Sequence, residues 1–395
     1  MSSRPTRRRA HIAMVGVPPI SHVLPSLSII RELADRGHRV TYANDPVVAD
    51  RIEAAGAEFV RCDSSLPVAD NQWPDDPIAS MRLFLEDAIG ALPQLRAHYD
   101  RDPADVYLYD IGGYAGRALA EAHGRPHLQI SPTYVAWDGY EEEVITPLMK
   151  LPGADAFRAR FSGWLAECGA STTDGQAFAG RPARALALIP PDMQPNLAGV
   201  DTERVTFVGP CFGDRAGRQE WRRPADARRV LLISLGSAFT RQVGFYRNCL
   251  AAFGELPDWH VVLGIGRHTD PAALGEVPAN VEVHAWVPQL SVLEQADAFV
   301  THAGMGGCAE GLANGVPMIA VPQAVDQFTN ADRLVELGVA RRLDTAEATP
   351  ERLREALRLL VNDPVVAHRS AELRERTRAG GGTAGAADLI EAAAG

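Results

Sequence analysis

The sequence predicts an α/β protein made of two doubly wound domains that face each other across a cleft. Short apolar segments rich in β-branched residues alternate with helical segments, which is typical of parallel sheets covered by helices. The alternation runs from His11 to Ser131 and restarts at Val230. The chain has 395 residues, more than one ordinary hydrophobic core supports, so we expect two domains.

The first block opens with a β-α-β unit. "HIAMVGV" (11–17) is typical of a buried strand, "PSLSIIRELADRG" from Pro25 predicts a helix that stops at Gly37, and "HRVTYA" predicts the next strand. Further strands are expected in "ADVYLYDI" and "PHLQIS", with the helical "GRALAEAHG" between them. No G-x-G-x-x-G follows the first strand, which disfavours a dinucleotide-dependent dehydrogenase.

The second block predicts strands in "RRVLLISLGSAF", "HVVLGIG", "VEVHAWV", "DAFVTHAG" and "PMIAVPQ". Between the blocks, residues 213–228 are polar and charged without a periodic apolar face, so we interpret them as an interdomain linker. This gives an N-terminal domain over 1–212 and a C-terminal domain over 229–378. Residues 379–395 are expected to form a C-terminal helix that packs back toward the N-terminal domain.

Composition excludes several classes of function. The chain carries 50 acidic and 39 basic side chains, a formal net charge of -11, which argues against nucleic-acid binding. No apolar run approaches the ~20 residues of a membrane span. The basic "RPTRRRA" near the start is followed by a strand rather than by the apolar region of a signal peptide. Five scattered cysteines without metal-ligand spacing suit reduced thiols, so we expect a cytoplasmic protein.

The strongest local signal is "VTHAGMGGCAEG". A strand is expected to end at Thr301 and His302. Gly304, Gly306 and Gly307 are expected to form a loop, and a helix is expected to begin through Cys308. Glycines let a phosphate approach the backbone, and a helix N-terminus supplies unpaired N–H groups. A glycine-rich turn between strand and helix is also common for purely structural reasons, so this motif alone is a weak indication.

The surrounding residues strengthen it. Asp326 and Gln327 follow the next strand, where an acid and an amide together can bind several hydroxyls of a sugar. Trp286 offers a flat face for a base and Gln289 a polar edge, while Glu310 can accept from ribose hydroxyls. Together these residues predict contacts to base, ribose, diphosphate and sugar within one domain.

The chain as a whole resembles the GT-B-fold macrolide glycosyltransferases of actinomycetes. The resemblance lies in "RELADRGHRVTYA", "GYEEEV", "SLGSAFT", "WVPQL", "THAG" and "PMIAVPQAVDQ". It implies two Rossmann-like domains, with uracil on the tryptophan, diphosphate on the histidine and a nearby serine, ribose on the glutamate and glucose on the Asp-Gln pair. Cys308 departs from the Ser or Thr more usual there. The predicted donor-binding residues are Ser237, Trp286, Gln289, His302, Gly304, Gly306, Gly307, Cys308, Glu310, Asp326 and Gln327.

A candidate catalytic pair lies in the first block. A histidine needs little tuning to act as a base near neutral pH, and an aspartate behind it fixes its tautomer. His22 follows the first strand and Asp110 ends another strand of the same sheet. Taken singly, His22 could be a capping or surface residue and Asp110 a helix N-cap. The resemblance favours the catalytic interpretation, because "SHVLP" matches the family's base, with departures at Ile20 and Ser21.

The resemblance implies an inverting O-glucosyltransferase that uses UDP-glucose as co-substrate, with no metal and no tightly bound cofactor. His22 would deprotonate a hydroxyl of a macrolide or similar hydrophobic natural product bound by the N-terminal domain. The sequence leaves open a monomer or a homodimer, and biosynthesis or self-protective antibiotic resistance. The predicted acceptor-binding residues are Trp73, Met81, Phe84, Tyr134, Trp137 and Tyr140.

Two other functions fit the same architecture. A GT-B-like UDP-sugar epimerase would interconvert free nucleotide sugars and would need no acceptor pocket. A helper protein would keep the fold without turnover, but it would have no use for His22, Asp110, Asp326 and Gln327.

Overall fold

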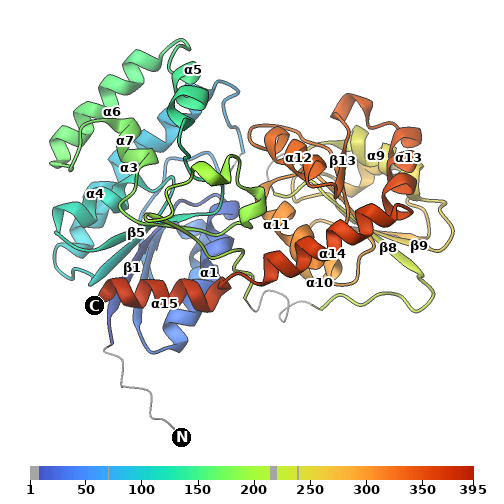
Figure 1. Ribbon diagram of the computed structural model, residues 1–395, viewed down its shortest axis with the longest axis horizontal. Helices are drawn as coiled ribbons and strands as arrows, with labels where there is room; N and C mark the ends of the chain where they lie inside the picture. The colour runs from blue at the N-terminus through green and yellow to red at the C-terminus, as the bar shows by residue number, and fades with distance from the viewer. Residues whose placement is uncertain (1–8, 70, 214–219, 238–239) are drawn as a thin grey trace, which may run out of the picture. The chain divides into compact units, whose positions relative to one another are not determined.

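The computed structural model describes residues 9–69, 71–213, 220–237 and 240–395 (Figure 1). The chain divides into two compact units, which are described separately. Unit 1 comprises Met1–Leu188, Asn196–Cys211 and Gly381–Gly395, and unit 2 comprises Ile189–Pro195 and Phe212–Gly380. Within the described ranges, the helices are all too short or too polar to cross a membrane.

Unit 1 is built on a seven-stranded parallel sheet in the order β3-β2-β1-β4-β5-β6-β7. Its strands are β1 (His11–Val15), β2 (Arg39–Asn44), β3 (Glu58–Arg61), β4 (Val106–Asp110), β5 (His127–Ser131), β6 (Ala185–Ala187) and β7 (Val205–Phe207). Its helices are α1 (Ile20–Asp35), α2 (Ala49–Ala54), α3 (Pro77–Tyr99), α4 (Tyr114–Ala122), α5 (Thr146–Leu148), α6 (Ala154–Cys168), α7 (Gly175–Gly180) and α15 (Gly382–Ala394).

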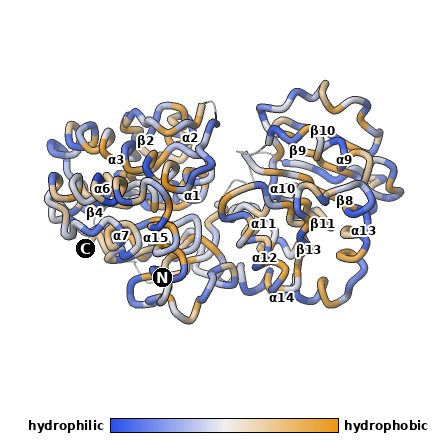
Figure 2. Tube along the Cα trace, turned by 90° about the horizontal axis from the view of Figure 1, so that it is seen from above, coloured by the Kyte–Doolittle hydropathy of each residue, from blue (hydrophilic) through white to orange (hydrophobic). Residues whose placement is uncertain are grey.

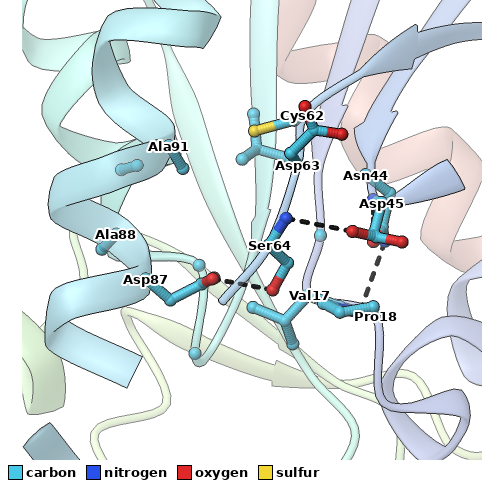
Figure 3. Close-up of a pocket in the computed structure, with 15 residues that line it drawn as sticks. Val17, Pro18, Asn44, Asp45, Cys62, Asp63, Ser64, Asp87, Ala88 and Ala91 are labelled. Carbon is cyan, nitrogen blue, oxygen red and sulfur yellow. Dashed lines mark hydrogen bonds between the residues drawn. The ribbon is translucent and has the colours of Figure 1, made fainter. Parts of the chain in front are cut away.

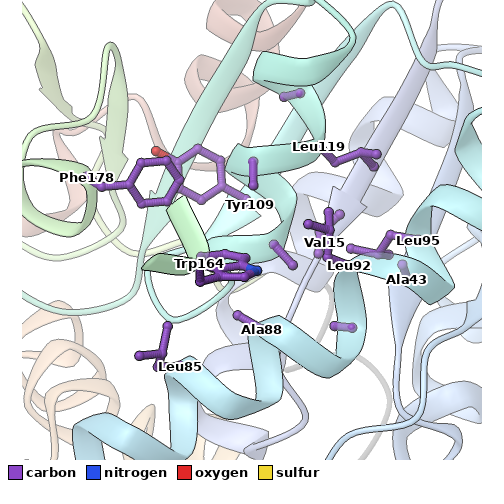
Figure 4. Packing of buried hydrophobic residues seen from close by; sticks show 14 of the residues in the cluster. Val15, Ala43, Leu85, Ala88, Leu92, Leu95, Tyr109, Leu119, Trp164 and Phe178 are labelled. Carbon is purple, nitrogen blue, oxygen red and sulfur yellow. The ribbon is translucent and has the colours of Figure 1, made fainter. Parts of the chain in front are cut away.

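Alternate residues of β1, β2 and β4 enter two different cores, because successive side chains point to opposite faces of a sheet. Val15 and Tyr109 pack with Leu85 of α3 and with residues of α4, α6 and α7 (Figure 4). Their neighbours on β1 and β4 face α1, α2 and α15. Both faces of the sheet are therefore covered, as the apolar strands predicted.

Unit 2 repeats the plan with a six-stranded parallel sheet in the order β10-β9-β8-β11-β12-β13. Its strands are β8 (Arg229–Ser234), β9 (Trp259–Gly264), β10 (Val281–His284), β11 (Ala298–Thr301), β12 (Met318–Ala320) and β13 (Ala340–Arg342). Its helices are α9 (Val243–Phe253), α10 (Gln289–Leu293), α11 (Met305–Asn314), α12 (Gln327–Glu336), α13 (Pro350–Val361) and α14 (Pro364–Arg378). The prediction of two doubly wound α/β domains is confirmed.

One face of the second sheet packs against α9 and α13, whose apolar side chains meet residues such as Ile233 and Val300. On the other face, α11 lies so close that a Cβ on Gly311 would be 2.7 Å from the sulfur of Met318. Helices such as α12 and α13 are strongly amphipathic, and hydrophilic and hydrophobic stretches alternate along the trace in Figure 2.

Helix α1 begins earlier than predicted. The sequence suggested a start at Pro25, but the helix begins at Ile20 and Pro25 lies inside it. A proline inside a helix lacks the N–H that would bond to the carbonyl four residues back, which is why it suggested a boundary. The hydroxyl of Ser26 donates to the carbonyl of Val23 at 2.9 Å, a local bond within this irregular turn. The earlier start places His22 on the first turn of α1.

The predicted linker and the predicted C-terminal helix belong to different units. Of the predicted linker 213–228, residues 214–219 lie outside the described ranges, and the rest belongs to unit 2. There the indole N–H of Trp221 donates to Glu282 at 2.6 Å. Helix α15 belongs to unit 1, where Arg36, the C-cap residue of α1, donates to Asp388 at 2.6 Å.

Candidate active site

Each sheet places its candidate histidine at the point where its strand order reverses. In open parallel sheets, ligands bind outside the carboxyl ends of the strands at this switch point. In unit 1 the two strands that flank it are β1 and β4, with Val15 paired to Tyr109. His22 follows β1 and Asp110 ends β4, so the topology brings these two residues together.

The side chains of His22 and Asp110 form a hydrogen-bonded pair. Nδ1 of His22 lies 2.9 Å from Oδ1 and 3.1 Å from Oδ2 of Asp110. Asp110 is 1% exposed, whereas the imidazole is 24% exposed. A buried carboxylate that accepts from Nδ1–H leaves the lone pair of the ring on Nε2. The pair thus has the tautomer that a general base requires.

The structure excludes one of the two roles considered for Asp110, the N-cap of the following helix. Helix α4 has Gly113 as its N-cap and no side-chain capping bond, so Asp110 does not cap it. Instead Oδ1 of Asp110 accepts the backbone N–H of Gly112 at 2.7 Å. This second bond fixes the carboxylate against rotation and helps to orient His22.

Two of the predicted acceptor residues, Trp73 and Phe84, make ring contacts near His22. The ring of Phe84 is centred 6.4 Å from the imidazole of His22 and 6.0 Å from the ring of Trp73. A Cβ on Gly112 would be 3.0 Å from Cδ1 of Phe84, so the glycine makes room for this aromatic side chain. Met81, one turn earlier on α3, packs partly buried against the core instead.

The other three acceptor candidates form a separate aromatic group. Trp137 makes an edge-to-face contact with Tyr140 at 4.7 Å, and Tyr134 lies 6.4 Å away. The indole N–H donates to Glu143 at 2.9 Å, in a π-helical turn over Glu141–Ile145. The ring contacts among the predicted acceptor residues thus comprise one pair, Trp73 with Phe84, and one group of three, Tyr134, Trp137 and Tyr140.

A narrow pocket in unit 1 is lined in part by Gly112, whose backbone N–H donates to Asp110 (Figure 3 shows the pocket). Val17, Gly112 and Gly113 contribute to its wall, but its lining does not include the six predicted acceptor residues. Asp87 of α3 holds the other side, accepting from the hydroxyl of Ser64 at 2.7 Å. The pocket wall is more polar than the aromatic residues suggested, and sequence reasoning did not identify it.

In unit 2 the strand order reverses between β8 and β11, where Ser234 pairs with Thr301. His302 follows β11, and its imidazole lies between two glycines. A Cβ on Gly236 would be 2.6 Å from Cε1 of His302, and one on Gly304 would be 2.3 Å from Nε2. Burial lowers the pKa of His302 to about 4, partly offset by the backbone of Ser234, so the ring is neutral at pH 7.

The glycine motif differs from the prediction in one respect. Helix α11 starts at Met305 with Gly304 as its N-cap, so Gly306 and Gly307 belong to its first turn rather than to a loop. Glycine without a Cβ can occupy a helix start as readily as a loop, and the sequence does not distinguish them. The N–H groups of this turn are the ones a phosphate would meet.

The remaining donor candidates occupy different surroundings. The side chain of Cys308 is 0% exposed, and burial raises the pKa of its thiol. Glu310 accepts from the amide of Gln289 at 2.7 Å, which links two predicted contacts. Trp286 is 41% exposed, as a stacking platform needs, and Ser237 is exposed.

The Asp-Gln pair lies at the start of α12, just beyond β12. Oε1 of Gln327 accepts the backbone N–H groups of Gln323 at 2.8 Å and of Ala324 at 3.2 Å, which leaves Nε2 as the donor. The preceding Val325 has φ of 46° and is 75% exposed. A β-branched residue in the left-handed region is strained, and such strain often marks a functional site.

No group of three or more His, Cys, Asp or Glu side chains with metal-binding geometry occurs in the described ranges. The two sites rest instead on a histidine–aspartate pair and on a helix N-terminus with a neutral histidine. Such an arrangement can remove a proton and bind a diphosphate.

Comparison with known proteins identifies the family. Oleandomycin glycosyltransferase of Streptomyces antibioticus is 54% identical over 97% of this chain and 90% of that protein. The chain belongs to the macrolide glycosyltransferase family. NDP-glycosyltransferase YjiC of Bacillus subtilis (strain 168), a more distant relative, is 31% identical over 98% of the chain and 97% of its own length.

Solved structures agree with this macrolide glycosyltransferase assignment. The glycotransferase of kitacinnamycin superposes with a TM-score of 0.91 at 52% identity, covering 98% of this chain and 99% of that one. CalG4, the calicheamicin glycosyltransferase, gives 0.85 at 33% identity, with 98% of each chain covered. Residues 247–389 also match the model for the C-terminal domain of erythromycin biosynthesis protein CIII-like proteins. The predicted family and GT-B fold are confirmed.

Two residues near the candidate donor site, Gly236 and Arg267, are not among the donor-binding residues predicted from the sequence. Gly236 makes room for the ring of His302, but the "SLGS" turn was interpreted only for its serine. Arg267 holds its guanidinium 5.8 Å from the ring centre of Trp286. Only a fold brings Arg267 to Trp286, because they lie on different loops.

Proposed function

We propose that this chain is an inverting O-glycosyltransferase that moves glucose from UDP-glucose to a hydroxyl of a macrolide or similar hydrophobic natural product. The observation that carries the proposal is the 2.9 Å bond between His22 and the buried Asp110. A helper protein would not need a buried carboxylate behind a partly exposed imidazole. The names of the relatives, among them an oleandomycin glycosyltransferase, support the reaction and the acceptor class.

In the proposed reaction, Nε2 of His22 takes the proton of the acceptor hydroxyl, and the oxygen attacks the anomeric carbon of glucose. The bond from that carbon to the diphosphate oxygen breaks, and UDP leaves with its electron pair. Attack opposite the leaving group converts an α-linked donor into a β-glucoside. Asp110 stabilises the imidazolium that forms and keeps Nδ1 protonated throughout.

On the donor side, the proposal assigns the diphosphate to His302 and to the N-terminus of α11. A neutral imidazole donates a hydrogen bond without carrying charge, so the helix N-terminus supplies most of the positive potential. Trp286 would stack on uracil, with Gln289 as a polar edge beside it, and Glu310 would bind the ribose. Asp326 and Gln327 would bind hydroxyls of the hexose. Ser237 would lie near the phosphates. The buried thiol of Cys308 fits better as packing under this turn than as a ligand contact.

The proposed function specifies both the nucleotide and the hexose of the sugar donor, and each needs its own test. A demethyllactenocin mycarosyltransferase of Streptomyces fradiae is 31% identical over 97% of the chain, so relatives differ in the sugar they transfer. Two sugar donors should therefore be compared, UDP-glucose and dTDP-glucose, each with a panel of macrolide and phenolic acceptors. Mass spectrometry then reports any hexosyl adduct.

Each outcome of this experiment has a meaning. An adduct formed faster from UDP-glucose supports the proposal. An adduct formed only from dTDP-glucose would mean that the donor carries dTDP and not UDP. Conversion of UDP-glucose into an isomer without acceptor would support an epimerase instead. UDP binding without turnover of either donor on any acceptor would support a helper protein.

A further inference from the structure

Asn330 connects two parts of the candidate donor site without belonging to either. It lies on α12 and is 1% exposed. Its amide nitrogen Nδ2 donates to the carbonyl of Ala303 at 3.1 Å and to Oδ2 of Asp326 at 3.0 Å. Both partners are acceptors, so the NH₂ group and not the amide oxygen faces them, and each hydrogen has its own acceptor.

The first partner lies in the loop that carries the diphosphate histidine. Ala303 follows His302, is 0% exposed and has φ of 59°, a left-handed conformation that costs a non-glycine residue on the order of 1–3 kcal/mol. Surrounding bonds must hold such a residue in place. Its N–H donates to Oγ1 of Thr301 at 3.1 Å, and its carbonyl accepts from Asn330.

The second partner is the acid of the pair proposed to bind the hexose. Asp326 is the N-cap residue of α12, and its carbonyl accepts the backbone N–H of Asn330 at 2.9 Å. The side-chain bond to the same Asn330 turns one carboxylate oxygen toward α12. With Oδ2 committed to this bond, the direction of Oδ1 is fixed as well.

We infer that Asn330 is a positioning residue that ties the diphosphate loop, His302–Gly304, to the hexose-binding carboxylate of Asp326. Recognition of the two halves of the donor then depends on one amide that contacts neither. This inference rests on the roles proposed above for His302 and Asp326. It predicts that loss of the two hydrogens weakens binding of the nucleotide and of the sugar together.

The test uses calorimetric dissociation constants for UDP and for UDP-glucose, which require no acceptor. Asn330→Asp keeps the shape of the side chain but replaces the NH₂ donor with an oxygen. We expect it to raise Kd about 10-fold or more for UDP-glucose and about 3-fold or more for UDP, because hydrogen bonds to charged groups are the stronger ones. Asp326→Ala should raise Kd for UDP-glucose alone.

A double variant tests the connection directly. If Asn330 acts on the sugar through Asp326, the UDP-glucose loss in Asn330→Ala combined with Asp326→Ala is smaller than the product of the single losses. The matched control is Asn280→Ala, which removes an amide that also donates to two acceptors, the carbonyls of Phe253 and Trp259, each at 3.1 Å. It should lower Tm without changing either Kd.

Wild-type Kd values in both Asn330 variants would overturn the inference. So would a double variant whose loss of UDP-glucose affinity equals the product of the single losses. An equal loss of affinity in Asn280→Ala would also overturn it. Failure of the proposed hexose role of Asp326 gives a different result from failure of the inference on Asn330. If Asp326→Ala binds UDP-glucose as the wild type does, the hexose role of Asp326 fails and the inference fails with it. If Asp326→Ala loses affinity and the Asn330 variants do not, only the inference fails.

Discussion

Asp110→Asn isolates the contribution of the carboxylate while keeping its size. The backbone N–H of Gly112 also bonds to Oδ1, at 2.7 Å, so the amide oxygen of the asparagine is expected to remain there. The amide NH₂ then takes the place of Oδ2, 3.1 Å from Nδ1 of His22, where it opposes the Nδ1–H donor and favours the tautomer with the proton on Nε2. That tautomer cannot accept a proton from a hydroxyl, so the variant should fold and bind ligands but transfer slowly.

The expected loss can be estimated from the geometry. Nδ1 and Oδ1 are 2.9 Å apart, and Asp110 is 1% exposed, so solvent screens the pair weakly. Two unit charges about 4 Å apart interact by about 4 kcal/mol at an effective dielectric constant of about 20. This energy stabilises the imidazolium that forms during transfer, and its loss corresponds to roughly 10³-fold in rate. A general base contributes about 10²–10⁴-fold, which agrees.

The assay is the initial rate of glucoside formation at saturating donor, followed by mass spectrometry, together with calorimetric UDP binding. The control is Asp105→Asn, which changes an aspartate that accepts the backbone N–H of His11 at 2.8 Å, just before β4. The control should retain its rate. An Asp110→Asn enzyme within about 3-fold of the wild-type rate would refute the role of the pair.

Three further predictions concern unit 2. Because the pKa of His302 is lowered from 6.5 to about 4, folding stability is complete above pH 6.5 and falls as the pH drops toward 4. His302→Gln lacks this titration, so at about pH 4.5 its free energy of unfolding should have fallen by on the order of 2 kcal/mol less than that of the wild type. The same slope of unfolding free energy against pH in both proteins would contradict the prediction. Gly236→Ala should raise Kd for UDP about 10-fold or more, since its Cβ would meet His302 at 2.6 Å and φ is +74°. The control Gly244→Ala, with open space at its Cβ, should preserve Kd; equal values in both variants contradict the role of Gly236. Trp286→Ala should weaken UDP about 10–100-fold through lost stacking, and calorimetry showing unchanged affinity would exclude uracil from this ring.

Much of the fold could be predicted because buried parallel strands are short apolar runs. β1, β4, β8 and β11 all lie within segments that the sequence identified, and these strands flank the two switch points. The start of α1 was wrong because Pro25 is a strong local signal against a helix, while tertiary packing of the helix prevailed. Gly306 and Gly307 were placed in a loop because glycine carries no preference that separates a loop from a first helical turn.

The candidate sites could be predicted only in part. His22 and Asp110 end up bonded because their strands are neighbours, which a doubly wound topology makes predictable. The roles of Gly236 and Asn330 depend on atoms a few ångströms apart that come from separate segments, and no spacing rule indicates them. The acceptor residues were chosen because large apolar side chains could line a pocket for a hydrophobic molecule. Such side chains serve the core as often as a binding site, and Met81 packs against the core.

The most direct test of the proposed reaction is the rate of hexosyl transfer by His22→Ala relative to the wild type. UDP-glucose and one productive acceptor are used, and mass spectrometry detects the glucoside. The variant should bind UDP with wild-type affinity, because His22 lies in unit 1 and the predicted UDP contacts lie in unit 2. We expect a glucoside from the wild type and a rate about 10²–10⁴-fold lower in the variant. A His22→Ala enzyme that forms the same glucoside at the wild-type rate would contradict this expectation.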